Sequence, residues 1–184
     1  FGSVYRAPAL PDAVDLDGVH TVAIYGEGAG VYADTLARLH PGLEISLVGL
    51  PAQNTRNLRD VAESRREKIQ RIDGSEFTAL ATPIDLAVAV EMVDSHPDAD
   101  ARLLLGALGA SARRVVLVTD VLDPQTTDDH ETEADLLKLC LHGSGQRTEA
   151  ELSALVAESG CGTPRFGALG WGSTVVEFSG TRQL

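Results

Sequence analysis

A glycine loop at residues 26–30 is the first part of this 184-residue chain whose residue types and spacing could do chemistry. The stretch VAIYGEGAG (22–30) is an apolar run followed by Gly26, Gly28 and Gly30 at alternate positions. Such a turn between a strand and a helix lets a ligand contact bare backbone at the helix N-terminus. The alternative is that these glycines only let the strand and the helix pack closely.

Glu27, inside this loop, distinguishes between the two classes of ligand that such loops commonly bind. A dinucleotide places its pyrophosphate at the helix N-terminus, where Glu27 would repel it, and needs an acid about 20 residues further on. That position holds Gly49, although Arg56 or Arg59 could serve an NADP variant. S-adenosylmethionine (SAM) has no phosphate and carries a cationic sulfonium, which a nearby acid attracts. The loop therefore favours SAM over a dinucleotide.

An acid-rich stretch, TTDDHETEAD (126–135), is the other cluster with chemical potential. It could suggest a divalent cation site, but its ligand spacing is not diagnostic of any metal. Acids are also expected in the first turn of a helix, and exposed charge runs are usually solvated. We interpret the stretch as a solvated face and predict no metal site.

Strands and helices that alternate along the chain must position these residues. Apolar runs predict strands at 19–25, 43–50, 84–93, 113–122 and 173–179, with weak strand signals at 68–72 and 76–81. Helices are predicted at 31–40, 54–68, 98–110, 132–143 and 147–160, the last opening with Thr148 and Glu151 at capping-box spacing. This order predicts an α/β fold with a mostly parallel sheet, covered by helices on both faces. Ligands of such sheets bind beyond the carboxyl ends of the strands, near residues 25, 49, 76 and 94.

The length and composition fit one domain, and the net charge limits the classes of partner that the chain could bind. The formal net charge of −12 excludes nucleic acid and anionic membrane surfaces as natural partners. No apolar run reaches the roughly 20 residues needed to span a bilayer. Cys140, expected on a buried helix face, and Cys161 have no metal-type spacing and suit inert thiols in the cytoplasm. Residues 1–18 contain Pro8 and Pro11 and are predicted to be an irregular lead-in to a domain at 19–184.

Three stretches resemble the small-molecule O-methyltransferase family of plant phenolic and bacterial polyketide-tailoring enzymes. DLLKLCLHGSGQRTEAELSALVAESG (135–160) is similar to that family's D-L-x-M-L segment and the E-R-T helix start after it, and LHPGLEISLVGLP (39–51) to its step ending in D-L-P. VAIYGEGAG resembles its V-D-V-G-G-G-x-G loop. The resemblance runs from Val19 to Phe178. It implies a Rossmann-like class I methyltransferase fold with a seven-stranded sheet, SAM as cofactor, and a small-molecule substrate.

The resemblance also assigns cofactor positions, several of which are substituted here. The family's acid two residues before the first glycine is Ile24, and the acid that binds the ribose falls in the Gly49–Leu50 step. Losing two charge-assisted hydrogen bonds of about 1.5–3 kcal/mol each would weaken SAM binding a hundredfold or more. Glu76, with Phe77 beside it, matches the family's adenine-binding acid. We expect SAM binding through Gly26, Glu27, Gly28, Gly30 and these positions to be weakened or lost.

The catalytic positions implied by the resemblance are changed as well. The family's proton-abstracting His corresponds to Asp94, and His96 follows two residues later. A carboxyl pKa of about 4 matches a phenol poorly, whereas His96 has a suitable pKa of about 6.5 but is followed by Pro97, which restricts its direction. The non-catalytic alternatives are that Asp94 is an acid at a helix N-terminus and that His96 is a solvent-facing loop residue.

Substrate-pocket positions complete the set. The two family glutamates that flank the base match Thr119, next to Asp120, and Gln146, and Asp135 matches an acid that faces the substrate pocket. The family's N-terminal helical domain has no counterpart in this sequence, so a protein partner is expected to complete the pocket. Three functions follow: an active SAM-dependent O-methyltransferase, a relative repurposed for other chemistry, or a pseudoenzyme that binds a partner. Intact scaffold and substituted contacts favour a domain that does not methylate efficiently.

Overall fold

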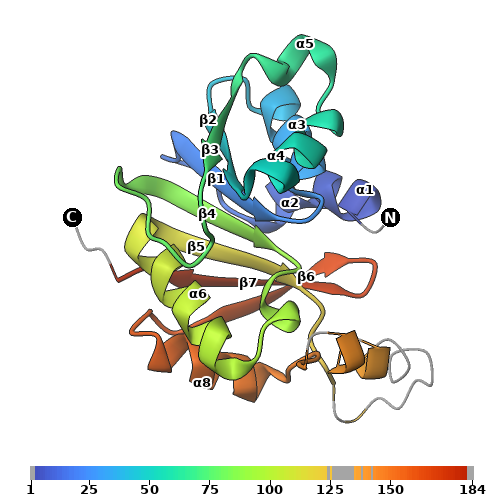
Figure 1. Cartoon of the computed structure of the whole chain (residues 1–184), viewed down its shortest axis with the longest axis vertical. Helices are drawn as coiled ribbons and strands as arrows, with labels where there is room; N and C mark the ends of the chain where they lie inside the picture. The colour runs from blue at the N-terminus through green and yellow to red at the C-terminus, as the bar shows by residue number, and fades with distance from the viewer. Residues whose placement is uncertain (1–2, 124, 126–134, 138, 142, 182–184) are drawn as a thin grey trace.

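One seven-stranded sheet organises the chain, in the order β3-β2-β1-β4-β5-β7-β6 (Figure 1). The computed structural model describes residues 3–123, 125, 135–137, 139–141 and 143–181. Neighbours among the first five strands pair in parallel, and β7 is antiparallel to both β5 and β6. The strands are β1 (Thr21–Gly26), β2 (Glu44–Gly49), β3 (Ile69–Asp73), β4 (Ile84–Val90), β5 (Ala112–Thr119), β6 (Arg165–Gly170) and β7 (Ser173–Ser179). The predicted mostly parallel α/β sheet is confirmed.

Helices cover both faces of this sheet because alternate strand residues point to opposite sides. Val22 and Ile24 of β1 belong to the core beneath α3, whereas Ala23 and Tyr25 belong to the core beneath α6 and α8. The helices after β1 whose bounds the structure describes are α3 (Ala29–Leu39), α4 (Pro51–Arg59), α5 (Glu63–Arg66), α6 (Asp98–Ser111) and α8 (Glu149–Glu158). A short 3-10 turn, η2 (Val93–Ser95), follows β4.

Three details of the predicted elements differ from the structure and one is confirmed. The helix predicted at 54–68 is divided into α4 and α5. Residues 76–81 form no strand, and β6 was not predicted, because most of its residues are exposed and two are glycine, so that it gives no apolar signal. The capping box is confirmed: Thr148 Oγ1 accepts a hydrogen bond from the Glu151 amide, and the Glu151 carboxylate accepts one from the Thr148 amide.

The N-terminal segment is ordered, so the predicted irregular structure is wrong for residues 3–13. Three short turns, α1 (Ser3–Arg6), η1 (Ala7–Ala9) and α2 (Leu10–Ala13), follow one another. Pro8 and Pro11 are the second residues of η1 and α2, in the first turn, where a missing N–H is tolerated. Ala7 and Leu10 are buried in the core beneath α3. The prolines thus begin helical turns instead of preventing them.

The structure also bears on three other predictions, for Cys140, the acid-rich stretch and membrane-spanning segments. Cys140 is exposed, which contradicts its predicted place on a buried helix face. The acid-rich stretch lies outside the described residues except for Asp135. No helix in the part of the chain that the structure describes combines the length and apolar character needed to cross a bilayer.

Candidate functional site

The glycine loop joins β1 to α3, and close packing accounts for two of its glycines. Gly26 has a φ of 103°, and a Cβ built on it would lie 2.2 Å from the Val90 carbonyl oxygen of β4. A Cβ on Gly30 would lie 1.9 Å from the Asn57 carbonyl oxygen of α4. Asn57 in turn donates from Nδ2 to the Gly26 carbonyl at 3.0 Å. The packing alternative is therefore satisfied at Gly26 and Gly30.

A cavity of about 720 Å³ opens over this loop, and we call it the loop cavity. The N-terminal segment, the loop, α4 and the segments after β3 and β4 all contribute to its wall, through Ser3, Val4, Gly26, Glu27, Gly28, Val31, Gln53, Asp60, Glu76, Glu91, Met92, Ser95 and His96. Four of these described residues are acids, one is a histidine, and none is Lys or Arg. The wall therefore favours a cationic ligand and disfavours a phosphate.

The structure brings half of the eight predicted cofactor residues to one wall: Gly26, Glu27, Gly28 and Glu76 line the loop cavity. The other four predicted positions lie off the cavity wall. The Phe77 ring lies edge-on to the His96 ring, with centroids 5.2 Å apart. Gly30 is buried against α4, Gly49 is not among the lining residues, and Leu50 is exposed.

His96 faces the loop cavity beside the residues predicted to bind adenine. Its Nδ1 lies 2.8 Å from the Met92 carbonyl oxygen, which we assign as a donated hydrogen bond. This tautomer leaves Nε2 as an acceptor when the ring is neutral, and Nε2 lies 3.9 Å from Glu76 Oε1. The ring is thus oriented by the backbone and presents a nitrogen to Glu76.

Asp94, two residues earlier on η2, points to a different place. Its side chain is 2% exposed and accepts a hydrogen bond from Thr119 Oγ1 at 3.0 Å, while the Ser144 hydroxyl donates to its carbonyl at 2.7 Å. Asp94 is not among the residues that line the loop cavity. The contact between positions 94 and 119 agrees with their predicted proximity, but it buries the carboxylate among protein groups.

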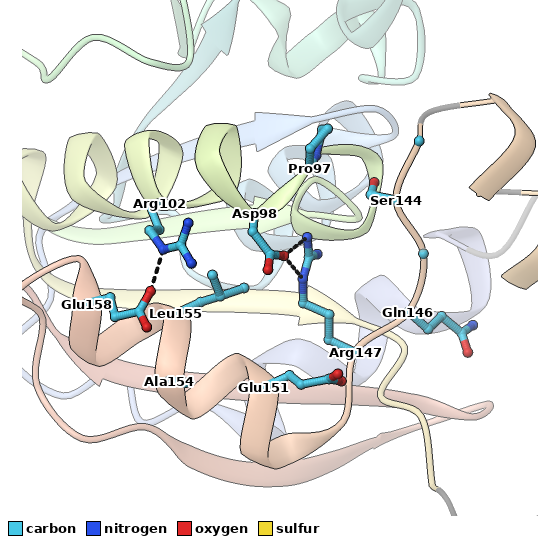
Figure 2. Close-up of a pocket in the computed structure, with 12 residues that line it drawn as sticks. Pro97, Asp98, Arg102, Ser144, Gln146, Arg147, Glu151, Ala154, Leu155 and Glu158 are labelled. Atoms are coloured by element: carbon cyan, nitrogen blue, oxygen red, sulfur yellow. Dashed lines mark hydrogen bonds and ion pairs between the residues drawn. The ribbon is translucent and has the colours of Figure 1, made fainter.

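Arg147 fixes the segment that carries Asp94 and His96. Its guanidinium donates to the Val93 and His96 carbonyls, each at 2.7 Å, and to the Asp98 carboxylate at 3.0 and 3.2 Å. The same guanidinium borders a second cavity, of about 390 Å³, between α6 and α8. There Arg102 pairs with Glu158, so the charged groups seen in Figure 2 largely neutralise one another.

The predicted substrate-pocket residues fall into two groups. The Asp135 carboxylate accepts a hydrogen bond from the backbone N–H of Gln146 at 2.5 Å. Gln146 borders the second cavity, and its side chain is turned away from the Arg147–Asp98 pair (Figure 2). Asp120, in contrast, lies at the end of β5. It accepts from the Ser173 hydroxyl at 2.7 Å and lies 3.3 Å from the Arg6 guanidinium, which also pairs with Glu91 at 2.5 Å.

Sequence reasoning missed three residues near the loop cavity: Arg6, Gln53 and Glu91. Arg6 was overlooked because its segment was predicted to be irregular, and Glu91 because it is the one charge that ends an apolar strand. Glu91 has a φ of 51°, in the region that non-glycine residues rarely occupy. Gln53 follows Gly49 by four residues, just after Pro51, which favours a helix start; its place in the first turn after the strand was the available signal.

Comparison with known proteins gives one family and a consistent fold. The O-methyltransferase domain family matches residues 4–162. Mouse (Mus musculus) acetylserotonin O-methyltransferase is 30% identical over 157 residues, which cover 80% of this chain and 41% of that protein. The chain therefore spans about two fifths of the length of this curated relative.

Solved structures agree with this match. Mitomycin 7-O-methyltransferase superimposes with a TM-score of 0.87 at 22% identity, covering 97% of this chain and 54% of the other. Human N-acetylserotonin methyltransferase, in complex with SAM, superimposes with a TM-score of 0.83 at 18% identity, covering 96% and 52%. These likenesses establish the class I methyltransferase fold.

Proposed function

This chain belongs to the O-methyltransferase domain family, and from that premise we propose that it binds SAM in the loop cavity without transferring the methyl group efficiently. The observation that carries this proposal is the opposite orientation of two neighbours on one turn. His96 faces the cavity, whereas Asp94, at the position of the family's base, is 2% exposed and held by Thr119.

The residues around the loop cavity fit SAM in charge and in shape. Glu27 lies in the glycine loop on the cavity wall, where it attracts the ammonium and sulfonium of the cofactor. Glu91, at the end of β4, lies on the same wall, but its charge is paired with the Arg6 guanidinium. Glu76 would accept a hydrogen bond from the adenine amine, and His96, with Phe77 beside it, would pack on the adenine ring. When bound, SAM supplies an electrophilic methyl group.

Methyl transfer to a hydroxyl also needs the substrate oxygen held in line and its proton removed. The Asp94 carboxylate is buried against Thr119. It cannot reach a substrate proton unless the segment around residues 93–96, which Arg147 holds by hydrogen bonds, moves. His96 has a suitable ring but lies beside Glu76, at the adenine end. Among the residues that the structure describes, no base is therefore positioned for efficient proton abstraction, and the function that remains is cofactor binding.

Calorimetric titration with SAM and with S-adenosylhomocysteine tests the proposal, alongside turnover on a panel of phenols. We expect saturable binding of both ligands, binding weakened about tenfold or more in Glu76→Ala, and negligible methylation. Thr78→Ala, exposed two residues away and off the cavity wall, is the matched control and should bind normally. Absence of binding would overturn the cofactor assignment. Turnover on the order of 1 s⁻¹ would instead identify an active O-methyltransferase.

A further inference from the structure

The end of β2 is where a nucleoside ribose is held in folds of this kind, usually by an acid that ends the strand. Here that position is Gly49, and its backbone oxygen is already occupied. The Gly49 carbonyl accepts from Asn54 Nδ2 at 3.0 Å and from the Gly74 amide at 3.0 Å. Neither a side chain nor a carbonyl of Gly49 is left to bind a ligand.

The space that a side chain at position 49 would need is taken by Gln53. A Cβ built on Gly49 would lie 2.9 Å from Gln53 Oε1 and 3.4 Å from Gln53 Cδ. Gln53 lines the loop cavity from the first turn of α4, four residues after Gly49 ends β2. Its amide makes no hydrogen bond with any residue in the described part of the chain. The amide is therefore a free polar group at the strand end, on the cavity wall.

The position of Gln53 is fixed by its neighbour on α4. Asn54 is fully buried, and its Nδ2 also lies 2.9 Å from the Ile72 carbonyl and 3.0 Å from Asp73 Oδ1, in addition to the Gly49 carbonyl. These contacts tie the first turn of α4 to the ends of β2 and β3. Gln53 is thereby fixed on the same cavity wall as the glycine loop and Glu76, the two parts of the wall that the proposed function assigns to the amino-acid end and the adenine of the ligand.

We propose that Gln53 binds the ribose diol of the adenosyl ligand in place of an acid at position 49, an inference that rests on the proposed function. The amide oxygen accepts from one ribose hydroxyl and the amide nitrogen donates to the other. Both bonds are neutral, so they are weaker than the bonds a carboxylate makes. The amide also adds no further negative charge to a wall that already carries four acids.

The test compares S-adenosylhomocysteine with its 2′-deoxy and 3′-deoxy analogues on four proteins by calorimetry: the wild type, Gln53→Ala, the double variant Gly49→Asp/Gln53→Ala, and Thr55→Ala. Thr55 lies on the same helix but lines a separate depression, so it is the matched control. We expect Gln53→Ala to weaken binding of the parent ligand about tenfold. In Gln53→Ala, the ratio of the affinity for S-adenosylhomocysteine to the affinity for each deoxy analogue should fall to about one. Thr55→Ala should change neither the affinity nor this ratio.

The double variant places a carboxylate at the strand end after removing the side chain that fills its space. It should recover wild-type affinity or better, together with the preference for the intact diol. Wild-type binding that Gln53→Ala leaves unchanged, with the same preference for the diol, would overturn the role of Gln53 alone. A wild type that binds neither S-adenosylhomocysteine nor adenosine would overturn the proposed function and this inference with it.

Discussion

The loop cavity and the surroundings of Asp94 are two neighbouring regions built from the same segment after β4, yet they differ in every physical respect. The cavity is open, acidic and lined by groups such as Gln53 that have no partner among the described residues. Around Asp94, the Thr119 and Ser144 hydroxyls and the Arg147 guanidinium are all used in hydrogen bonds within the protein. The difference shows that space for a ligand and a base for its chemistry are separable, because Asp94 and His96, two residues apart in one segment, face different regions.

The largest effect is expected from removing the guanidinium that closes the Asp94 region. Arg147→Met leaves the Val93 and His96 carbonyls without their charged donor and should lower the free energy of unfolding by about 3 kcal/mol, measured by urea denaturation. Arg102→Met, which breaks an exposed pair with Glu158, should cost less than about 1 kcal/mol. Equal effects of the two substitutions would show that the region is not closed by Arg147.

A smaller effect is expected on the cavity side, where the glycine loop packs on α4. Gly30→Ala forces a Cβ against the Asn57 backbone and should destabilise the protein by about 2–3 kcal/mol in thermal or urea unfolding. Gly106→Ala in α6 meets no atom within 4 Å and should be neutral or stabilising by up to about 1 kcal/mol. If Gly30→Ala were tolerated as well as Gly106→Ala, the glycine at position 30 would need another explanation than packing.

Thr119→Val tests the separation of the two regions directly. Removing the hydroxyl that donates to Asp94 should cost about 1–2 kcal/mol of stability. Affinity for S-adenosylhomocysteine should stay within about twofold of the wild type, because Thr119 does not line the loop cavity. A parallel loss of affinity and stability would break the comparison, since it would mean that the Asp94 region shapes the ligand site.

The smallest effect concerns acid stability on the face of α3, away from Asp94. The Arg65 guanidinium, by its bidentate hydrogen bonds, holds the pKa of Asp34 below its usual range. A carboxyl whose pKa is lower in the folded state stabilises the fold above its unfolded pKa, and this contribution is lost as pH falls through the folded pKa. Asp34→Asn should therefore lower stability at pH 7 by less than about 1 kcal/mol. Its stability should then decline less than that of the wild type between pH 5 and pH 3, and an unchanged decline would contradict the assignment.

The sheet could be predicted from sequence because its strands are buried on both sides and read as continuous apolar runs. Ile84–Val90 shows this best, with five fully buried residues in succession. β6 escaped prediction for the opposite reason, since only Leu169 of its six residues is buried. The N-terminal turns escaped because proline was taken to exclude helix, although it suits the first positions of a helical turn.

The site was less predictable than the fold because contact between distant segments decides it. Spacing placed Glu76, Phe77 and Glu27 near the cavity, and the structure brings them there. Spacing could not tell that Asp94 turns inward and His96 outward, since this depends on Thr119 and Arg147, which lie 25 and 53 residues beyond Asp94 in the sequence. The position of Gln53 could not be predicted either. It lies at the end of β2 because Asn54, the next residue, contacts Gly49, Ile72 and Asp73 through its side-chain amide.

The central claim is that ligand binding persists where methyl transfer does not. Equilibrium dialysis of the chain against methyl-labelled SAM, followed by addition of phenols to the same sample, measures both quantities on one protein. We predict label retained in proportion to protein and no label on any phenol above the level found without protein. Label passed to a phenol at enzymatic rates, or no label retained at all, would contradict the account.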